Sequence, residues 1–540
     1  YINERNDNDG KKHEISDALI EKMEGFMKNP YSTEFPGIEP NQNKTNWASS
    51  KDAVYANTDW FDYYFKKSAI RHSHNISIQG GSEKTSYYVG LGYIYQEGLM
   101  DKVQDDLEKY NVNTKFSIRA TDWLKFNFNN NVSLSLLKRP LANQTIFYGT
   151  IANMSPSRVT KLPVEQAEYS TPTWNEQLYL QKAGYSQNRV SDAMSFSAII
   201  TPLEGLEFVG EMKARLDVEN NSFELRKGNY ALPNGSVMEV SGNKQGYHYP
   251  GMKWQNTQFG SLTRGSVFNY YLSPSVTGAY TRQWGDHFFK GMAGFQMELQ
   301  ENSSEYMYKD GMLSEDIYSF DNANGTPYAA EARSHWATMG MFARLNWNYR
   351  NIYFLEFSGR YDGSSRFAPD NRWGFFPSAS VGWNIAREKF FLPVSKVVNT
   401  FKVRASYGSL GNQNTSSLYP TYSTIGTGTG SWIIDGTLAN IAWAPSLVSY
   451  NLSWEKIRTW NAGVDFGLFN NRLTGSFDYY IRKTDDMVGP SEKLPVVLGT
   501  AVPSSNNTNL KTFGWELELM WKDRLNNGLN YSARFTLADS

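Results

Sequence analysis

The chain of 540 residues contains no cysteine, which excludes disulfide scaffolds, zinc–thiolate sites and thiol catalysis. It also lacks an excess of either charge, with 53 Lys and Arg against 54 Asp and Glu, so nucleic acid is not expected as a partner. No apolar run approaches the roughly eighteen residues of a membrane-spanning helix. A β-sheet that spans a membrane remains possible, because the water-filled side and the loops of such a sheet are polar.

Aromatic side chains are abundant: the chain has 34 Tyr, 31 Phe and 16 Trp. Tyr and Trp combine an apolar ring with a polar group, which suits the two interfaces of a membrane. A large soluble β protein can be equally rich in aromatic residues. Composition therefore permits both classes, and the order of the residues has to separate them.

Between residues 109 and 136, apolar and polar side chains alternate almost without error, interrupted only by a tight turn at Thr121–Trp123. A period of two predicts two antiparallel strands of about a dozen residues each, one on either side of the turn. Strands of soluble proteins usually have about five or six residues. Long strands with one aromatic face and one charged face are typical of a sheet that has lipid on one side and water on the other.

The segment 206–218 has the same pattern with more charge. Charged side chains beside lipid are costly, whereas beside water they are not. We therefore predict that its charged face points into a water-filled lumen and its apolar face points to lipid. The residues predicted to face the lumen are Glu207, Glu211, Lys213 and Arg215, and those predicted to face lipid are Phe208, Met212 and Leu216.

Alternating segments recur along the chain, joined by short turns and long connections in turn. This regularity predicts an all-β protein, a transmembrane antiparallel up-and-down β-barrel with about sixteen strands in this chain and long extracellular loops. The predicted strands are 73–80, 85–96, 109–120, 124–137, 189–201, 206–218, 266–283, 287–300, 335–349, 352–361, 375–387, 400–408, 455–468, 472–484, 511–522 and 528–538. The predicted long loops are 138–188, 219–265, 302–333, 409–453 and 485–510.

Two domains are expected. Residues 1–71 are predicted to be an extracellular loop segment with a short helix, which Ser16 caps and which ends near Asn29. Residues 72–540 are predicted to form the barrel strands and loops, truncated at the C-terminal end. No basic and apolar leader is visible at the start. We expect this sequence to be an internal piece of a longer protein.

Several strings carry a resemblance to a known family. They are NTDWFD at 57–62, ISIQGGSEKTSYY at 76–88, RYDGSSRFAP at 360–369, NRWGFFPS at 371–378, RASYG at 404–408 and LFNNRL at 468–473. In this order they resemble the SusC/RagA family of TonB-dependent outer-membrane transporters, which pair with a SusD-like surface lipoprotein.

The resemblance implies a barrel of about 22 strands in the Gram-negative outer membrane, plugged from within by an N-terminal domain. It implies that TonB supplies energy through an N-terminal segment that is not in this sequence. It also implies import of bulky nutrients, oligosaccharides or peptides, and a dimer of transporter–lipoprotein pairs. Two alternatives stay open, a passive porin-like barrel and a soluble all-β binding or scaffold protein.

No residue pattern indicates catalysis, a cofactor or a metal, so the chain is not expected to be an enzyme. His72 and His74 share one face of a strand, and we interpret them as polar residues at a strand start. The glycine-rich stretch 426–430 lacks the Lys of a phosphate-binding loop and is interpreted as a mobile outside loop.

Exposed aromatic rings on long loops stack on sugar rings or peptide side chains, and they also pin loops together by burial. Both roles stay open for the aromatic residues outside the predicted strands. The candidate ligand contacts are Tyr169, Trp174, Tyr179, Trp432 and Trp443.

Overall fold

The computed structural model describes residues 15–48, 53–140, 144–163, 183–239, 243–244, 257–258, 260–314, 316–415, 417–445, 447–490, 495 and 502–540. Its α-helices are α2 (Asp17–Lys28), α3 (Trp60–Tyr64) and α4 (Gln144–Asn153). Short 3-10 helices follow at η3 (Phe320–Asn322), η4 (Pro369–Asn371), η5 (Ile385–Arg387) and η6 (Lys389–Phe391). Within these described residues, no helix has the length and apolar character needed to cross a membrane.

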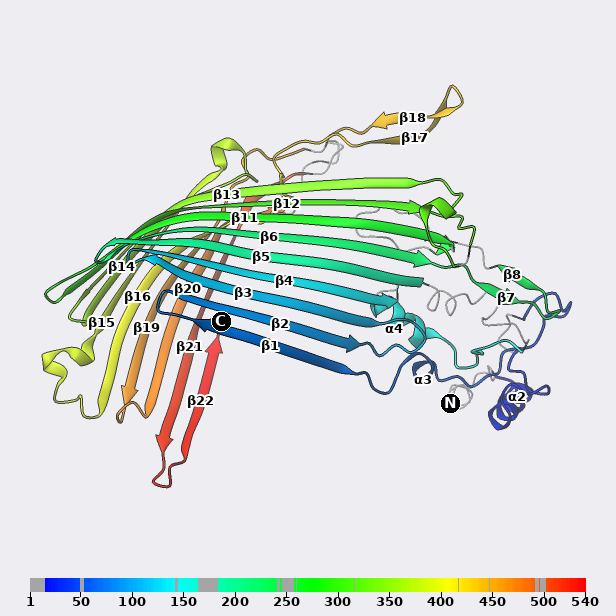
Figure 1. Cartoon of the computed structure of the whole chain (residues 1–540), viewed down its shortest axis with the longest axis horizontal. Helices are drawn as coiled ribbons and strands as arrows, with labels where there is room; N and C mark the ends of the chain where they lie inside the picture. The colour runs from blue at the N-terminus through cyan, green and yellow to red at the C-terminus, as the bar shows by residue number, and fades with distance from the viewer. Residues whose placement is uncertain are drawn as a thin grey trace.

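One sheet of 16 strands dominates the molecule (Figure 1), and its strands neighbour one another in chain order, each pair antiparallel. This is the predicted up-and-down arrangement. The strands are β1 (Arg71–Gly81), β2 (Thr85–Glu97), β3 (Asp106–Thr121), β4 (Leu124–Pro140), β5 (Ala183–Leu203), β6 (Leu206–Leu225), β11 (Ser261–Trp284), β12 (His287–Lys309), β13 (Tyr328–Tyr349), β14 (Tyr353–Ser364), β15 (Trp373–Asn384), β16 (Val398–Asn412), β19 (Glu455–Leu468), β20 (Leu473–Pro490), β21 (Ser504–Arg524) and β22 (Asn530–Asp539).

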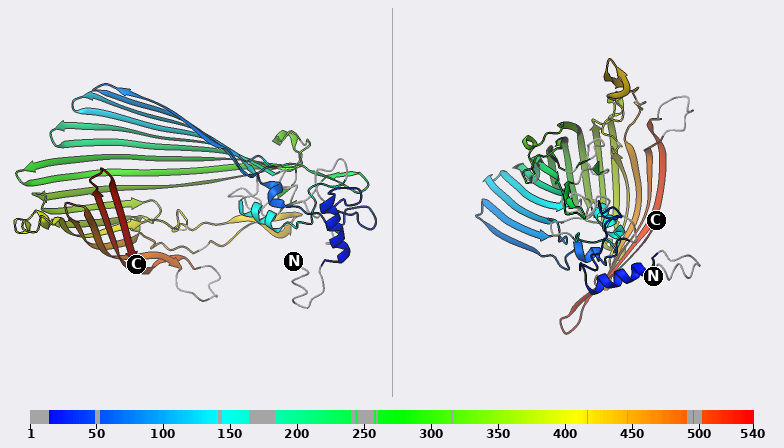
Figure 2. Two further views of the ribbon diagram at one scale, coloured as in Figure 1. Left: turned by 90° about the horizontal axis from the view of Figure 1, so that it is seen from below. Right: turned by 90° about the vertical axis from the view of Figure 1, so that its right-hand side faces the viewer.

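The sheet curves strongly around the strand direction, from β1 at one edge to β22 at the other (Figure 2). Among the described residues, β1 pairs with β2 alone and β22 with β21 alone, so the two edges are not joined to each other. The remaining strands form three small hairpins. These are β7 (Asn229–Ala231) with β8 (Val237–Glu239), β9 (Asn243–Lys244) with β10 (Thr257–Gln258), and β17 (Thr427–Ile434) with β18 (Thr437–Ala442).

The predicted strands all exist, but several were predicted too short at the end with the long connections, which we call the loop end. There β6 continues to Leu225, β12 continues to Lys309, and β13 already begins at Tyr328. Hydropathy stops alternating in these extensions, yet backbone hydrogen bonds continue to pair them. The predicted loops 138–188, 219–265 and 302–333 were therefore too long. Two connections at this end, 98–105 and 365–372, are also short.

Helix α2 begins as predicted, because the Ser16 hydroxyl accepts a hydrogen bond from the Leu19 N–H, and Asn29 ends it. Leu19 and Phe26 are buried, whereas Met27 is 60% exposed. The buried face belongs to a small core that joins the N-terminal segment to the connection between β4 and β5. Its members are Leu19, Phe26, Ile38, Trp47, Val54, Tyr55, Ala56, Val159 and Leu162.

Backbone and side-chain hydrogen bonds hold this N-terminal segment at the loop end of the sheet. The Ala56 N–H donates to the Ser157 carbonyl over 2.9 Å, and Trp47 Nε1 donates to the Ala231 carbonyl over 2.7 Å. Lys66 Nζ lies 2.6 Å from Glu97 Oε1 at the end of β2, and this hydrogen bond raises the pKa of Lys66. The segment is thus tied to two different connections and to the end of β2.

Candidate functional site

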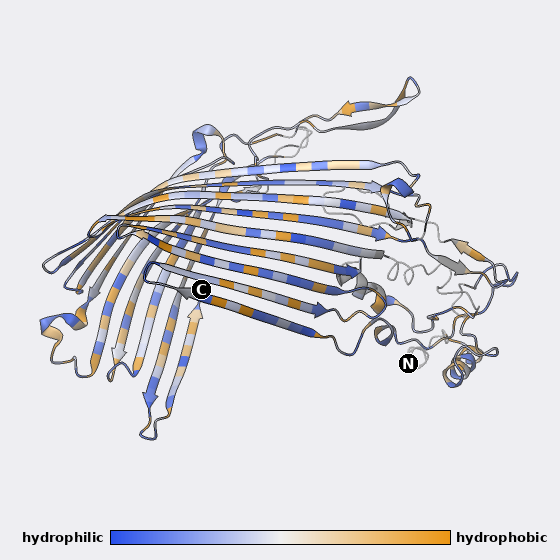
Figure 3. Ribbon diagram, viewed as in Figure 1, coloured by the Kyte–Doolittle hydropathy of each residue, from blue (hydrophilic) through white to orange (hydrophobic). Residues whose placement is uncertain are grey.

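The sheet has two chemically distinct faces, visible as alternating stripes along each strand (Figure 3). On β6, Lys213 lies opposite Ser195 of β5, while its neighbour Met212 lies opposite Phe196. We call the side with Lys213 the polar face and the side with Met212 the apolar face. Met212 and Phe208 are each 42% exposed, so the structure covers the apolar face with no protein layer at these positions.

The polar face of β3 to β6 is hollowed by a cavity of about 510 Å³. Arg215, one of the residues predicted to face the lumen, lines it together with hydroxyl, amide and cationic side chains. The other lining residues are Lys109, Asn111, Asn131, Ser133, Ser135, Gln187, Arg189, Ser191 and Ala193. An adjoining hollow is lined by Lys213 and Tyr271 among others. This wall can donate and accept many hydrogen bonds.

Charges on the polar face are mostly paired. Lys213 Nζ lies 3.0 Å from Glu211 Oε2, and Asp217 receives Arg215 at 2.9 Å and Arg189 at 3.4 Å. The alternation brought Glu211, Lys213 and Arg215 to one face as predicted, but it did not reveal that Asp217 on this face also pairs with Arg189 of another strand.

Amide and hydroxyl side chains fill the space between the ion pairs. The Asn127 carbonyl oxygen accepts from the Ser117 hydroxyl over 2.9 Å, and its amide lies 3.2 Å from the Ser197 hydroxyl. Asn129 makes the same kind of contact with Ser195. These uncharged cross-strand contacts connect β3, β4 and β5 on the polar face.

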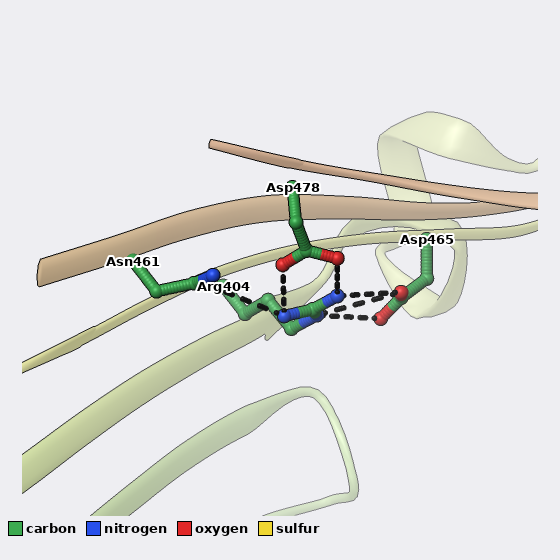
Figure 4. A network of polar contacts seen from close by, with 4 residues as sticks. All are labelled: Arg404, Asn461, Asp465 and Asp478. Carbon is green, nitrogen blue, oxygen red and sulfur yellow. Dashed lines mark hydrogen bonds and ion pairs between the residues drawn. The ribbon is translucent and has the colours of Figure 1, made fainter. Parts of the chain in front are cut away.

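The densest network on this face surrounds Arg404 of β16 (Figure 4). Its guanidinium donates two hydrogen bonds to Asp478 of β20, at 2.7 and 2.6 Å, and further ones to Asp465 and Asn461 of β19. A bidentate arginine–carboxylate contact fixes both distance and orientation. Arg404 therefore links three neighbouring strands.

The aromatic residues predicted as ligand contacts differ in their exposure and in the contacts they make, where the structure describes them. Trp432 at the end of β17 is 79% exposed and free to contact another molecule. Trp443 is 52% exposed, but its ring lies against the hairpin, since a Cβ on Gly428 would stand 2.5 Å from Trp443 Cη2. Tyr169, Trp174 and Tyr179 lie outside the described residues.

The glycine-rich stretch 426–430 was wrongly interpreted as a loop, because residues 427–430 form the first half of β17. Its small residues leave room for the Trp443 ring. The hairpin extends away from the sheet (Figure 1) and exposes Ile433 by 71% and Ile434 by 59%. The run Trp432–Ile434 in a polar connection was the signal for this surface.

No group of three or more metal-ligating side chains occurs among the residues that the structure describes. The imidazole rings of His72 and His74 lie 5.2 Å apart and stack with Tyr95 and Tyr93 respectively. They belong to an aromatic cluster on the apolar face of β1 and β2.

The family model described as "TonB dependent receptor-like, beta-barrel" matches residues 28–540. A curated relative, the TonB-dependent receptor SusC of Bacteroides thetaiotaomicron, is 31% identical over 505 residues, which cover 87% of this chain and 46% of SusC. The TonB-dependent receptor P3 of Formosa agariphila is 25% identical, with 89% of this chain and 46% of P3 covered. The chain thus spans about half the length of these relatives.

Among solved structures, the RagAB peptide transporter has a TM-score of 0.69 and 21% sequence identity, with 89% of this chain and 52% of that chain covered. This likeness supports the fold. Sheet, faces and comparisons together define a β-barrel of the bacterial outer membrane, in a family of transport proteins rather than enzymes. The chain belongs to the TonB-dependent receptor β-barrel family and is similar to SusC.

Proposed function

We propose that this chain is the barrel part of a transporter that imports bulky nutrients, oligosaccharides or peptides, across the outer membrane with energy from TonB. The observation that carries the proposal is the family match over residues 28–540, combined with a sheet that has one polar and one apolar face. TonB would act through an N-terminal segment outside this sequence. The transported class rests on the likeness to SusC and to the RagAB peptide transporter.

The polar face is proposed to line the lumen, with Glu207, Glu211, Lys213 and Arg215 toward water and Phe208, Met212 and Leu216 toward lipid. The exposure of Met212 and Phe208 supports this direction, because a soluble protein would bury such residues. A charged side chain facing lipid at mid-membrane costs about 2–4 kcal/mol for Arg or Lys. The opposite orientation would pay this cost at many positions.

A SusD-like lipoprotein is proposed to dock on the loop end and to close over the barrel mouth, in a dimer of transporter–lipoprotein pairs. The exposed apolar tip of the β17–β18 hairpin supports a docking role, since clustered exposed apolar side chains commonly mark interaction sites. The N-terminal segment, proposed as an extracellular domain, adds further surface at the same end. Trp432 is the better placed of the two described aromatic candidates for contact with ligand or lid.

Uptake by cells that carry the full-length gene tests the proposal. Deletion of the gene is expected to abolish growth on one class of oligosaccharide or peptide, and loss of TonB is expected to do the same. A passive porin-like barrel is the second candidate. It predicts that uptake continues without TonB, and that outcome would replace the first proposal.

A further inference from the structure

The connection between β14 and β15, residues 365–372, is a short loop fixed firmly at the loop end of the sheet. We call it the rim loop. The Ser365 N–H donates to the Ala337 carbonyl over 2.9 Å, and the Ser365 hydroxyl accepts from the Ala337 N–H over 2.9 Å. Phe367 is fully buried in a small core with Phe376, Leu452 and Trp454. The rim loop therefore holds its side chains in defined places.

Arg366 of the rim loop stacks on an aromatic ring that belongs to the polar face. Its guanidinium carbon lies 5.3 Å from the centre of the Trp336 ring. Trp336 and Thr338 lie two residues apart on β13 and therefore share the polar face. The Thr338 hydroxyl contacts Glu298, and Glu298 accepts a hydrogen bond from the hydroxyl of Tyr271, which lines the hollow beside Lys213. Arg366 thus stands where the polar face reaches the loop end.

Arg366 and Arg372 are the two arginines of the rim loop. Both lack an acidic partner within the described part of the chain. The Nε atoms of both side chains are buried without a hydrogen bond, although the residues are half-buried rather than enclosed. Other arginines of the polar face differ, since Arg360 pairs with Asp362 at 3.0 Å and Arg404 with two aspartates. Burial lowers the pKa of Arg366 from its ordinary value.

We propose that the rim loop binds a carboxylate of the imported molecule, with Arg366 and Arg372 as its cationic contacts. The planar guanidinium matches a carboxylate through two parallel hydrogen bonds, and stacking on Trp336 keeps it oriented before binding. The inference rests on the proposed import function and narrows its substrates to acidic oligosaccharides or acidic peptides. The two classes share the carboxylate, so one experiment covers both.

The test is titration calorimetry on the full-length protein in detergent with four probes: trigalacturonate, the neutral galactose trimer, a triglutamate peptide and a triglutamine peptide. At low salt, one acidic probe is expected to bind at least about tenfold more tightly than its neutral counterpart. The double variant Arg366→Gln, Arg372→Gln is expected to remove this preference. Arg350→Gln, at the opposite end of the sheet, is the matched control and is expected to keep it.

Equal binding of acidic and neutral probes by the unaltered protein would overturn the proposal, and so would an acidic preference that survives in the double variant. Thermal unfolding checks the fold. If the double variant unfolds, the variant Arg366→Lys, Arg372→Lys keeps both charges but loses the planar fork. It is expected to weaken acidic binding several-fold, and unchanged affinity would contradict the proposal.

The failure of this inference can be told apart from failure of the import function. TonB-dependent uptake without any acidic preference in the calorimeter removes the rim site alone. An acidic preference that Arg366 and Arg372 account for, in a protein whose loss affects no uptake, keeps the site and removes the import function.

Discussion

At the scale of single residues, the chemistry of each strand is decided by which side of the sheet a side chain takes. Lys213 and Met212 are neighbours in sequence, yet one makes an ion pair with Glu211 and the other is exposed next to apolar side chains. A shift of one residue in strand register would exchange all these positions. The alternation of apolar and polar residues therefore fixes the strand register as well as the two faces of the sheet.

Cysteine labelling tests the direction of the two faces. With Met212→Cys, a lipophilic thiol reagent is expected to react in membranes, and a charged impermeant reagent is not. With Lys213→Cys, the pattern is expected to reverse, because this position faces water. The chain has no native cysteine to interfere. Lipophilic labelling at 213 but not at 212 would reverse the assignment.

Removal of the Arg404 side chain tests its role as a link between strands. Arg404→Met is expected to lower the stability of the barrel by about 1–3 kcal/mol, because two aspartates then lose their charged donor. Arg534→Met, which loses one contact with Glu518 at a more exposed site, is the control, with an expected effect below about 1 kcal/mol. Unfolding in denaturant measures both, and equal effects would argue against a special role for Arg404.

At the scale of elements, the loop end is more structured than its polar sequence suggests. The extended ends of β6, β12 and β13 carry the paired sheet beyond the alternating segments. The N-terminal segment packs its own small core against the connection between β4 and β5. The β17–β18 hairpin extends away from the sheet in Figure 1.

The hairpin is expected to contribute to lipoprotein binding. The double variant Trp432→Ala, Ile433→Asp removes apolar side chains from its tip, and the amount of lipoprotein that co-purifies is expected to fall about tenfold or more, as at other aromatic interface sites. Phe390→Ala is the control, because Phe390 is 64% exposed at the opposite end. Undiminished co-purification would show that the lid docks elsewhere.

At the scale of the whole molecule, a curved sheet with one exposed apolar face needs a membrane. Met341 and Phe375 are each 62% exposed, and Val276 is 58% exposed. Apolar surface of this extent is unfavourable in water by about 25 cal/mol per Å². This exposed apolar surface argues against the alternative of a soluble all-β scaffold protein. The family match that identifies the barrel excludes the same alternative independently.

Phase partition measures this property directly. The full-length protein is expected to enter the detergent phase of a temperature-induced separation and to precipitate when the detergent is removed. A soluble protein of the same preparation serves as the control in the aqueous phase. A chain that stays dissolved and folded without detergent would contradict a membrane-spanning sheet.

The sequence by itself determined the number of strands in the main sheet, their order, their antiparallel pairing and the two faces, whereas the three small hairpins were not predicted. These follow from local chemistry, because alternating hydropathy has the period of a strand and short polar turns join neighbours. Glu211, Lys213 and Arg215 could be assigned to one face on this basis. The start of α2 at Ser16 was predictable for a similar reason, since a cap is a contact between near neighbours.

Only the tertiary structure decided which residues meet across the sheet. Arg404 reaches Asp478 from a strand two places away, and Arg366 of the rim loop meets Trp336 of β13. The loop-end extensions of the strands depend on backbone pairing, which hydropathy does not record. Contacts of this kind join residues that are distant in sequence, and no local pattern specifies them, because curvature and register act on the whole sheet at once.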